Sequence, residues 1–273
     1  MNFLKALFGR EEFNLSSGNK IKSPLNKIPF IIFILLIVGF IAVEVTGFKF
    51  GTIVKNGHKF FTILSRMFPP DINYVMNVKD PLIDTIKMSF LGSLIGSLLA
   101  FPVAALSAVN INANKFTLKL IRVILSIIRT LPTLVIALIA TYIFGLGTFA
   151  GTLAISIFTF GIVAKMLYEQ IETVDMGPFE AMESLGSTKI RAFFSSVVPQ
   201  ILPIYISICL YSFEINVRYA AILGYVGAGG IGLLLNNNVG MRQYSKVGMV
   251  ILMLFLTVVI IESTSRHFRE RLN

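Results

Sequence analysis

Six long apolar runs constrain this chain more than any other feature of its sequence. A helix that crosses a bilayer needs about 20 apolar residues. Lipid supplies no hydrogen-bond partners for the backbone, so such runs must be helical. The sequence therefore predicts an all-α, polytopic membrane protein with about six transmembrane helices. Their approximate ranges are 29–46, 84–108, 120–144 with a break at Pro132, 148–167, 199–223 and 247–264.

The composition excludes both a water-soluble domain and a disordered chain. Hydrophobic residues make up 55% of the 273 residues and charged residues 14%, and the mean hydropathy is +0.79. Soluble domains are about 45–50% apolar and about 25% charged, and disordered chains are more polar still. Most of the chain is therefore expected to have lipid as its solvent.

Redox, metal and nucleotide chemistry have no candidate residues. The chain has one cysteine, Cys209, and two histidines, His58 and His267, which are far apart in the sequence. One cysteine forms neither an intrachain disulfide nor a thiolate metal cluster. The pattern G-x-x-x-x-G-K-[ST], which cradles nucleotide phosphates, is absent from the sequence. We therefore predict no enzyme activity and no catalytic, metal-binding or cofactor-binding residues.

The surplus of basic residues predicts the orientation of the chain in the membrane. The formal net charge is +10, and membrane proteins concentrate Lys and Arg in cytoplasmic loops. The strand pattern of RNA-binding proteins is missing, so nucleic acid is not an expected partner. With both termini in the cytoplasm, the inner segments hold twelve Lys and Arg residues and the outer segments seven.

This orientation divides the chain into five parts. They are a cytoplasmic N-terminal segment at 1–28, a first transmembrane helix at 29–46, an extracytoplasmic loop at 47–83, a main transmembrane domain at 84–265 with a cytoplasmic loop at 168–198, and a cytoplasmic C-terminus at 266–273. Within the extracytoplasmic loop, residues 52–68 alternate basic and apolar groups, which is typical of an interfacial helix.

The loop after the fourth span is the most informative polar stretch. Its Gly-Pro pair at 177–178 favours the start of a helix, because proline suits the first helical turn. Phe179, Met182 and Leu185 then recur every third residue and predict one apolar edge. Gly186 favours the end of that helix, because glycine adopts the left-handed conformation at low cost. A second short helix is expected before the next span, and an ordinary inner loop is the alternative interpretation.

Four polar residues inside the spans are candidates for a polar path through the membrane, since charges in lipid are costly. Glu214 and Arg218 are four residues apart, in the order that favours an ion pair. They either neutralise each other or leave Arg218 facing a pore, where a guanidinium suits an oxyanion. Arg129 is a similar candidate. Ser93 lies on a serine face beside glycines in G-x-x-x-G spacing, which indicates close helix packing or a polar stripe along a pore.

A glycine-rich segment lies between the fifth and sixth spans. Its Gly227, Gly229, Gly230 and Gly232 satisfy the pattern G-x-G-x-x-G. That pattern indicates dinucleotide binding only between a strand and a helix, with an acid about 20 residues further on, and neither condition is met here. We interpret the segment as a turn at the outer mouth, where glycines let the backbone bend and pack closely.

Two motifs resemble those of binding-protein-dependent ABC importer permeases. Glu180-Ala181, Gly186 and a later proline, Pro199, resemble the EAA loop of that family, although Val198 precedes this proline where leucine is common. Residues 211–232, YSFEINVRYAAILGYVGAGGIG, are similar to the corresponding segment of phosphonate-type permeases.

The resemblance implies a transport subunit without its own motor. Glu180, Ala181, Glu183, Leu185 and Gly186 would form a coupling loop that docks on a separate ABC ATPase. Two copies of this chain, two ATPase subunits that use ATP and an extracytoplasmic substrate-binding protein would act together. The solute would be phosphonate or a related phosphorus oxyanion, carried across the cytoplasmic membrane of a prokaryote.

Three other functions are weighed against this one. A methionine-type permease has a similar glycine-rich segment but lacks the sequence FEINVR. An ion-coupled secondary transporter needs inverted repeats and paired broken helices, and no repeat is visible here. A membrane scaffold or sensor needs an appended soluble domain, and no segment of this sequence is long enough to form one.

Overall fold

The computed structural model describes residues 12–14, 20–22 and 27–272. The chain divides into two units, residues 1–62 and 63–273, and each is described by itself. Most of the predicted N-terminal segment lies outside the described residues. Two short strands within it, β1 (Glu12–Asn14) and β2 (Lys20–Lys22), pair in antiparallel register.

The first unit contains the first predicted span. α2 (Ile28–Thr46) ends at Gly47, whose φ of 63° is a left-handed conformation suited to glycine. α3 (Phe50–Arg66) follows and extends into the second unit. A helix is therefore present where the sequence predicts an interfacial one, and its location at a membrane surface stays a prediction. Helical geometry places its apolar face opposite its cations, which are Lys55, Lys59 and Arg66.

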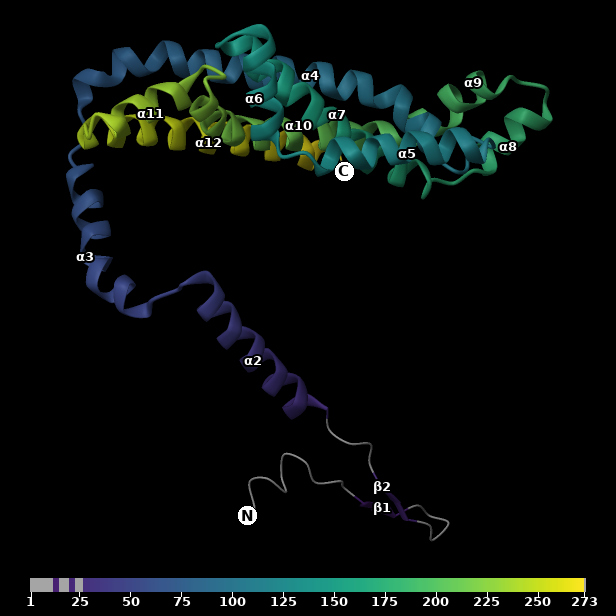
Figure 1. Ribbon diagram of the computed structural model, residues 1–273. Coiled ribbons are helices and arrows are strands. Elements are labelled where there is room, and N and C mark those ends of the chain that lie inside the picture. Colours follow the sequence, from purple (N-terminus) through teal and green to yellow (C-terminus); the bar gives the residue numbers. More distant parts are fainter. Residues whose placement is uncertain (1–11, 15–19, 23–26, 273) are drawn as a thin grey trace. The chain divides into compact units, whose positions relative to one another are not determined.

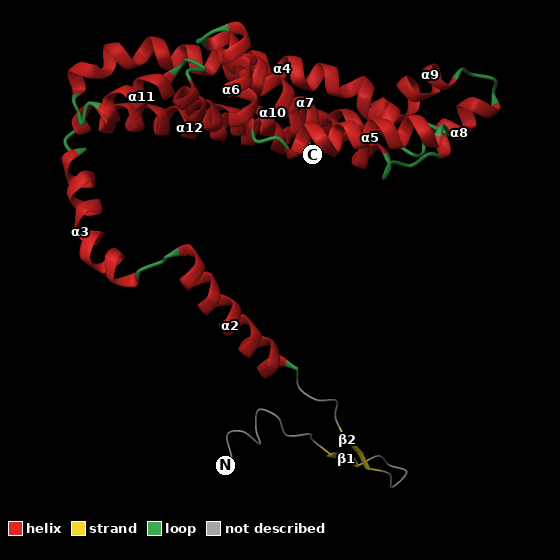
Figure 2. Ribbon diagram, in the orientation of Figure 1, coloured by secondary structure: helices red, strands yellow, loops and turns green. Residues whose placement is uncertain are grey.

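The described part of the second unit is built from helices (Figures 1 and 2). Its elements in chain order are η1 (Ile72–Tyr74), α4 (Val75–Ser107), α5 (Lys115–Thr130), α6 (Thr133–Phe144), α7 (Thr148–Ile171), α8 (Gly177–Ser184), α9 (Lys189–Ala192), the π-helix η2 (Phe193–Val197), α10 (Val198–Leu223), η3 (Gly224–Val226), α11 (Ile231–Gly240) and α12 (Tyr244–Leu272).

The predicted membrane fold is confirmed. Five helices of the described chain are long and apolar enough to cross a membrane, and α5 with α6 makes a sixth span if this bent pair is counted as one. The two helices of the pair meet at an angle of 87°. The bend lies at Pro132, which has no N–H to continue α5 and disfavours helical backbone at Leu131 before it.

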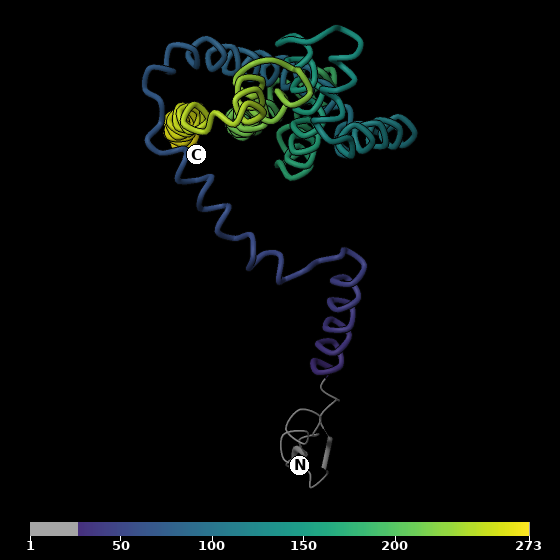
Figure 3. The backbone as a smooth tube through the Cα atoms, turned by 60° about the vertical axis from the view of Figure 1, so that its left-hand side comes forward, coloured from purple at the N-terminus to yellow at the C-terminus, as the bar shows by residue number. Residues whose placement is uncertain are grey.

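Several helices extend beyond their apolar runs. α4 begins at Val75, so residues 75–83 are helical and the predicted outer loop is shorter than expected. α12 continues to Leu272, so residues 266–272 prolong the last helix instead of forming a separate tail. Apolar composition marks only the part of a helix that lies in lipid. Figure 3 looks almost along α10 and α12, which run side by side and are joined by ion pairs.

Small residues bring α4 and α7 into close contact. A Cβ atom built on Gly96 would lie 2.5 Å from the carbonyl oxygen of Ser156. A Cβ atom built on Gly92 would lie 2.7 Å from the Ile155 side chain. Both distances are shorter than real contacts, so α7 occupies the space that a side chain would need. The G-x-x-x-G spacing on α4 therefore serves helix packing.

A buried amide joins α4, α7 and α10. Asn216 on α10 is 1% exposed, and its Nδ2 donates to Ser93 Oγ on α4 and to Thr159 Oγ1 on α7, both at 2.7 Å. Interhelical hydrogen bonds in lipid contribute about 0.6–2 kcal/mol each. Ser93 is itself 4% exposed. This geometry favours the packing interpretation of Ser93 over a polar stripe along a pore.

We predict that Gly96→Ala destabilises the protein and that Gly240→Ala does not. The new methyl group at position 96 would collide with α7, and overpacking of this kind costs about 1–3 kcal/mol. At Gly240, the last residue of α11, a Cβ atom would have no neighbour within 4 Å. The midpoint of thermal unfolding in detergent, measured for both variants, checks this. Equal midpoints would contradict the close α4–α7 contact.

Candidate functional site

The predicted loop forms two short helices joined at one glycine, and we call residues 177–192 the elbow. The Gly177 N–H donates to the Asp175 carboxylate at 2.9 Å, which fixes the turn just before α8. Gly186 has a φ of 83°, and its N–H donates to the Glu183 carbonyl at 2.9 Å. The Ser187 N–H donates to the Met182 carbonyl at 3.1 Å. This pair of bonds closes α8 as glycine-ended helices commonly close.

The inner face of the elbow is anchored in a core made by three long helices. Phe179 is 4% exposed. It belongs to a cluster with Ala104 from α4, Leu167 from α7 and Ile201 from α10. The same cluster includes Phe193 of the π-helix that joins α9 to α10. The elbow is therefore packed against three of the long helices.

Polar bonds fix the loops beside the elbow. Arg122 pairs with Glu172 and also donates to the Ser107 carbonyl at 2.7 and 2.9 Å. Asn110 donates to the Ile171 carbonyl at 2.7 Å. Gln200 donates to the Asp175 carbonyl at 3.1 Å. Sequence reasoning missed these residues, because their partners are 15 to 61 positions away and no local spacing signals them.

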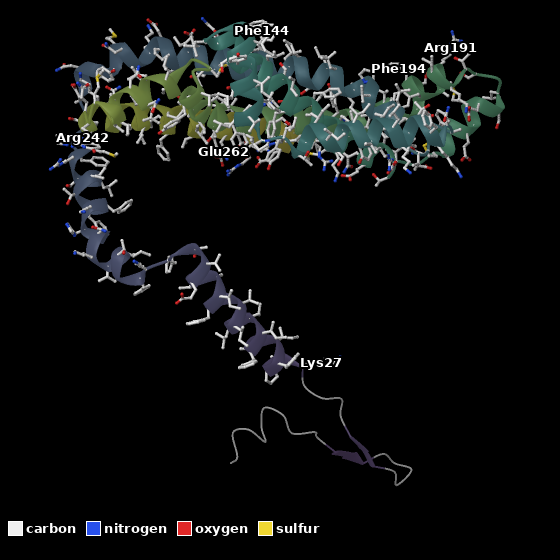
Figure 4. All side chains as sticks on the ribbon, viewed as in Figure 1. Lys27, Phe144, Arg191, Phe194, Arg242 and Glu262 are labelled. Atoms are coloured by element: carbon white, nitrogen blue, oxygen red, sulfur yellow. The ribbon has the colours of Figure 1, made fainter. Side chains whose placement is uncertain are left out.

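The outer face of the elbow exposes large apolar side chains. Leu185 is 84% exposed and Ile190 is 73% exposed, and Phe194, two residues after the elbow, is 56% exposed. The three residues of the predicted apolar edge therefore differ in burial, because Phe179 lies in the core whereas Leu185 faces outward. Leu185 is the C-cap residue of α8, and its N–H donates to the Ala181 carbonyl at 3.1 Å. Figure 4 shows Arg191 and Phe194 together at this end of the bundle.

The other predicted coupling residues divide between exposed and half-buried positions. Glu180, Ala181 and Gly186 are exposed, and Glu183 is half-buried. Glu180 also lies in the first turn of α8, where a carboxylate interacts favourably with the helix dipole. The elbow thus presents acidic and apolar groups to its surroundings.

The charged pair on α10 belongs to a larger network with α12. Glu214 is 6% exposed and accepts from Arg218 at 2.6 Å and from Arg269 at 3.2 Å. Arg218 also pairs with Glu262 at 3.0 Å, and Glu262 pairs with Arg266 at 3.0 Å. Glu262 (labelled in Figure 4) therefore bridges two arginines.

Arg129 has a different environment. It is exposed, and none of the described residues forms an ion pair or hydrogen bond with its guanidinium. It lines a cleft of about 360 Å³ with Thr130, Thr133 and Tyr219. A Cβ atom on Gly161 of α7 would lie 3.1 Å from Cγ of Arg129. The absence of a side chain at Gly161 therefore leaves room for the aliphatic part of Arg129. Arg129 is thus available to an anion, whereas Arg218 is occupied by two carboxylates.

The glycine-rich segment is a tightly packed turn. Gly227, Gly229 and Gly230 all have left-handed φ angles, between 69° and 80°. A Cβ atom on Gly232 would collide with the carbonyl oxygen of Ala221. The segment is also bonded to α4, because the Ile231 N–H donates to Thr85 Oγ1 at 2.7 Å. These contacts support the interpretation of the segment as a turn.

Residues 92–273 match the family model of the binding-protein-dependent transport system inner membrane component. This match covers more than half of the chain, and the chain therefore belongs to that family. It is an inner-membrane transport subunit of the ABC importer class, which works with an ATPase and a substrate-binding protein.

Three known proteins illustrate the similarity. The phosphite transport system permease protein PtxC of Stutzerimonas stutzeri is 32% identical over 212 residues, 76% of this chain and 77% of that protein. The phosphate-import permease protein PhnE of Mycolicibacterium smegmatis is 32% identical over 211 residues, 77% of this chain and 40% of that protein. A chain of the MetNI methionine ABC transporter in an inward-facing conformation superposes with a TM-score of 0.66 at 19% identity, covering 74% of this chain and 99% of that one. At that identity the superposition shows the fold alone.

We predict that Phe179→Ala loosens the elbow, because removal of a buried phenylalanine costs about 3–5 kcal/mol. Limited proteolysis of the purified protein should cut within residues 172–188 faster in this variant. Leu185→Ala is the matched control, since Leu185 makes its contacts with solvent. Equal cleavage of Phe179→Ala and the unaltered protein would contradict the anchoring role of Phe179.

Proposed function

We propose that this chain is the translocation subunit of an ABC importer for phosphonate or a related phosphorus oxyanion. The observation that carries the solute class is the 32% identity to a phosphite permease over three quarters of both chains. The segment at 211–232, which resembles phosphonate-type permeases, supports the same class. A methionine permease is the alternative, and its support is a shared fold at 19% identity.

The elbow is the proposed contact with the ATPase subunit. Large apolar side chains in water mark interaction surfaces, and Leu185 and Ile190 are both mostly exposed on a short segment outside the long apolar helices. Glu180 and Glu183 would add charged contacts beside them. Two copies of the chain would bring two elbows to two ATPase subunits.

The packing of the elbow suggests how ATP-driven movement reaches the membrane helices. Phe179 lies in one core with residues of α4, α7 and α10. Movement of the elbow would therefore displace these three helices. The helices would then change between inward- and outward-facing arrangements. ATP drives this change only if the ATPase binds the elbow differently in the two arrangements.

Arg129 is the proposed contact of the solute within the membrane. Its guanidinium lacks a carboxylate partner among the described residues, and a planar guanidinium matches a phosphorus oxyanion. The hydroxyl groups of Thr130 and Thr133 line the same cleft. Arg218 and Glu214 are weaker candidates, because their charges neutralise each other and those of α12.

The solute class is tested by reconstituting the chain with its ATPase and binding protein in liposomes. Uptake of radiolabelled phosphite, methylphosphonate and methionine should be compared with ATP inside and outside the vesicles. We predict uptake of at least one phosphorus oxyanion and no uptake of methionine. The uptake should require ATP on the side of the membrane that carries the elbow and the ATPase subunit. Methionine uptake without oxyanion uptake would overturn the proposal.

We predict that Leu185→Asp weakens the association with the ATPase subunit. A charge would replace an apolar contact in the proposed interface, and truncation of a central anchor costs about 2–4 kcal/mol. Co-purification of the ATPase and oxyanion uptake should both fall. Ala113→Asp, in the exposed loop between α4 and α5, is the matched control and should retain both. Full coupling in Leu185→Asp would remove the elbow from the interface.

We predict that Arg129→Gln lowers oxyanion uptake while the ATPase stays bound and is still stimulated by the loaded binding protein. Loss of one charge-assisted contact costs about 1.5–3 kcal/mol, or roughly tenfold or more in affinity. Arg218→Gln should instead lower the midpoint of thermal unfolding, because it leaves Glu214 and Glu262 short of a partner. Undiminished uptake by Arg129→Gln would exclude Arg129 from the path.

A further inference from the structure

A polar cleft that the transport cycle described above does not use lies at one end of the second unit. Its volume is about 460 Å³. Three cations line it, Arg66 at the end of α3, Arg242 after α11 and Lys246 in the first turn of α12. The one acidic residue in its wall is Asp71. The cleft therefore carries a formal charge of about +2.

The walls of the cleft are held together by backbone contacts. The Asp71 N–H donates to the Ser245 carbonyl at 3.1 Å. One turn further along α12, Gly248 lies so close to the Met67 carbonyl that no side chain would fit there. The segment before α4 and the start of α12 are thus fixed against each other, and the cleft between them has a defined shape.

The three cations lack a carboxylate partner within the described part of the chain. Among the described residues, none of them forms a salt bridge, and the Asp71 carboxylate instead accepts from the Asn73 N–H at 3.1 Å. The Lys246 ammonium lies 5.0 Å from the centre of the Tyr74 ring, a contact that keeps its positive charge. An uncompensated group of cations in a concave site favours a negatively charged ligand.

The backbone at Arg242 gives a second, independent indication. Arg242 has a φ of 56°, and it is the one described residue other than glycine with a positive φ. It occupies the position after a helix at which glycine is usual, and its N–H donates to the Val239 carbonyl at 3.0 Å. An arginine in this conformation strains the backbone, and such strain is common at ligand sites.

The start of α12 adds hydrogen-bond donors to the cleft. In the described chain, the N–H groups of Tyr244 and Ser245 have no acceptor, because the first bonds of the helix come from Lys246 and Val247 to the Gln243 carbonyl. The N-terminus of a long helix with free N–H groups attracts anions. Guanidinium groups and helix N–H groups together match the oxygens of a phosphate-like group.

The cleft and the elbow lie at opposite ends of α4. Asp71 and Tyr74 precede the first turn of α4, whereas Ala104 and Ala108 at its other end pack against the elbow. α4 has 33 residues and is therefore about 50 Å long. Figure 4 shows Arg242 at one end of the bundle and Arg191 of the elbow at the other. With the elbow on the ATPase side, the cleft faces the exterior.

We propose that this outer cleft binds a tetrahedral phosphorus oxyanion, which is either the free solute before it enters the membrane path or the phosphate of a lipid headgroup. The free-solute case rests on the proposed function. The residues that would hold the anion are Arg66, Arg242, Lys246 and the N–H groups that begin α12. Asp71 would limit the affinity, so that the anion is released again.

The test measures binding of inorganic phosphate to the complex of this chain with its ATPase subunit, in a maltoside detergent that contains no phosphorus. Arg242→Gly removes the charge and also relieves the strained backbone, so weaker binding by this variant cannot come from a distorted turn. We expect its dissociation constant to rise about tenfold. Arg242→Lys keeps the charge and should stay within about threefold of the unaltered protein.

A matched control and a second arm separate the sources of the anion. Arg271→Gln, near the other end of α12, should bind phosphate as the unaltered protein does. In nanodiscs of phosphatidylglycerol, competition that removes phosphate binding to the unaltered protein would identify the lipid headgroup as the occupant. Retained phosphate binding in these nanodiscs would identify the free anion.

Two results with the variants would overturn the proposal, and the comparison with uptake separates it from the proposed function. One is equal binding of phosphate, and equal retention of phosphatidylglycerol, by Arg242→Gly, Arg66→Gln and the unaltered protein. The other is a result in which Arg242→Gly and Arg66→Gln bind phosphate as the unaltered protein does but associate more weakly with the substrate-binding protein. That result would assign the cations to protein docking. If oxyanions are taken up but phosphate does not bind in the cleft, the proposed anion site is wrong and the proposed function stands. Phosphate binding without oxyanion uptake would instead defeat the proposed function.

Discussion

Close packing of α4 against α7, with the Asn216 amide bonded to both from α10, is the interaction on which the rest of the structure depends. In lipid, burial of apolar surface gives helices little reason to associate, so close contacts and interhelical hydrogen bonds must hold them together. These three helices also supply the core beneath Phe179. The position of the exposed Leu185 is therefore determined by contacts made deep inside the bundle.

Local rules predicted the features that depend on local physics. Apolar runs gave the spans, Pro132 gave the break between α5 and α6, and Gly186 gave the end of α8. Spacing could not say which residues of the apolar edge are buried, since Phe179 lies in the core whereas Leu185, six residues further along the chain, is exposed. The start of α4 at Val75 was missed because its first turns are polar.

The long-range contacts of the site could not be predicted from spacing. Arg122 and Glu172 are 50 positions apart, and Glu214 and Arg269 are 55 apart. The rule that charges in membrane spans are functional selects Arg129 and Arg218 equally. What separates them is the presence or absence of a carboxylate partner, and that depends on which helices are neighbours. The fold class and the two-helix form of the elbow were therefore predictable, whereas the partners of individual charges were not.

The last helix does not end as a free tail. Arg269, three residues before the end of α12, is bonded to the buried Glu214 of α10, the helix that follows the elbow. A bulky label attached to the last turns of α12 would consequently disturb the Arg269–Glu214 pair and, through it, α10. Purification and imaging of this transporter are better served by labels placed on a partner subunit, where they add no load to α10.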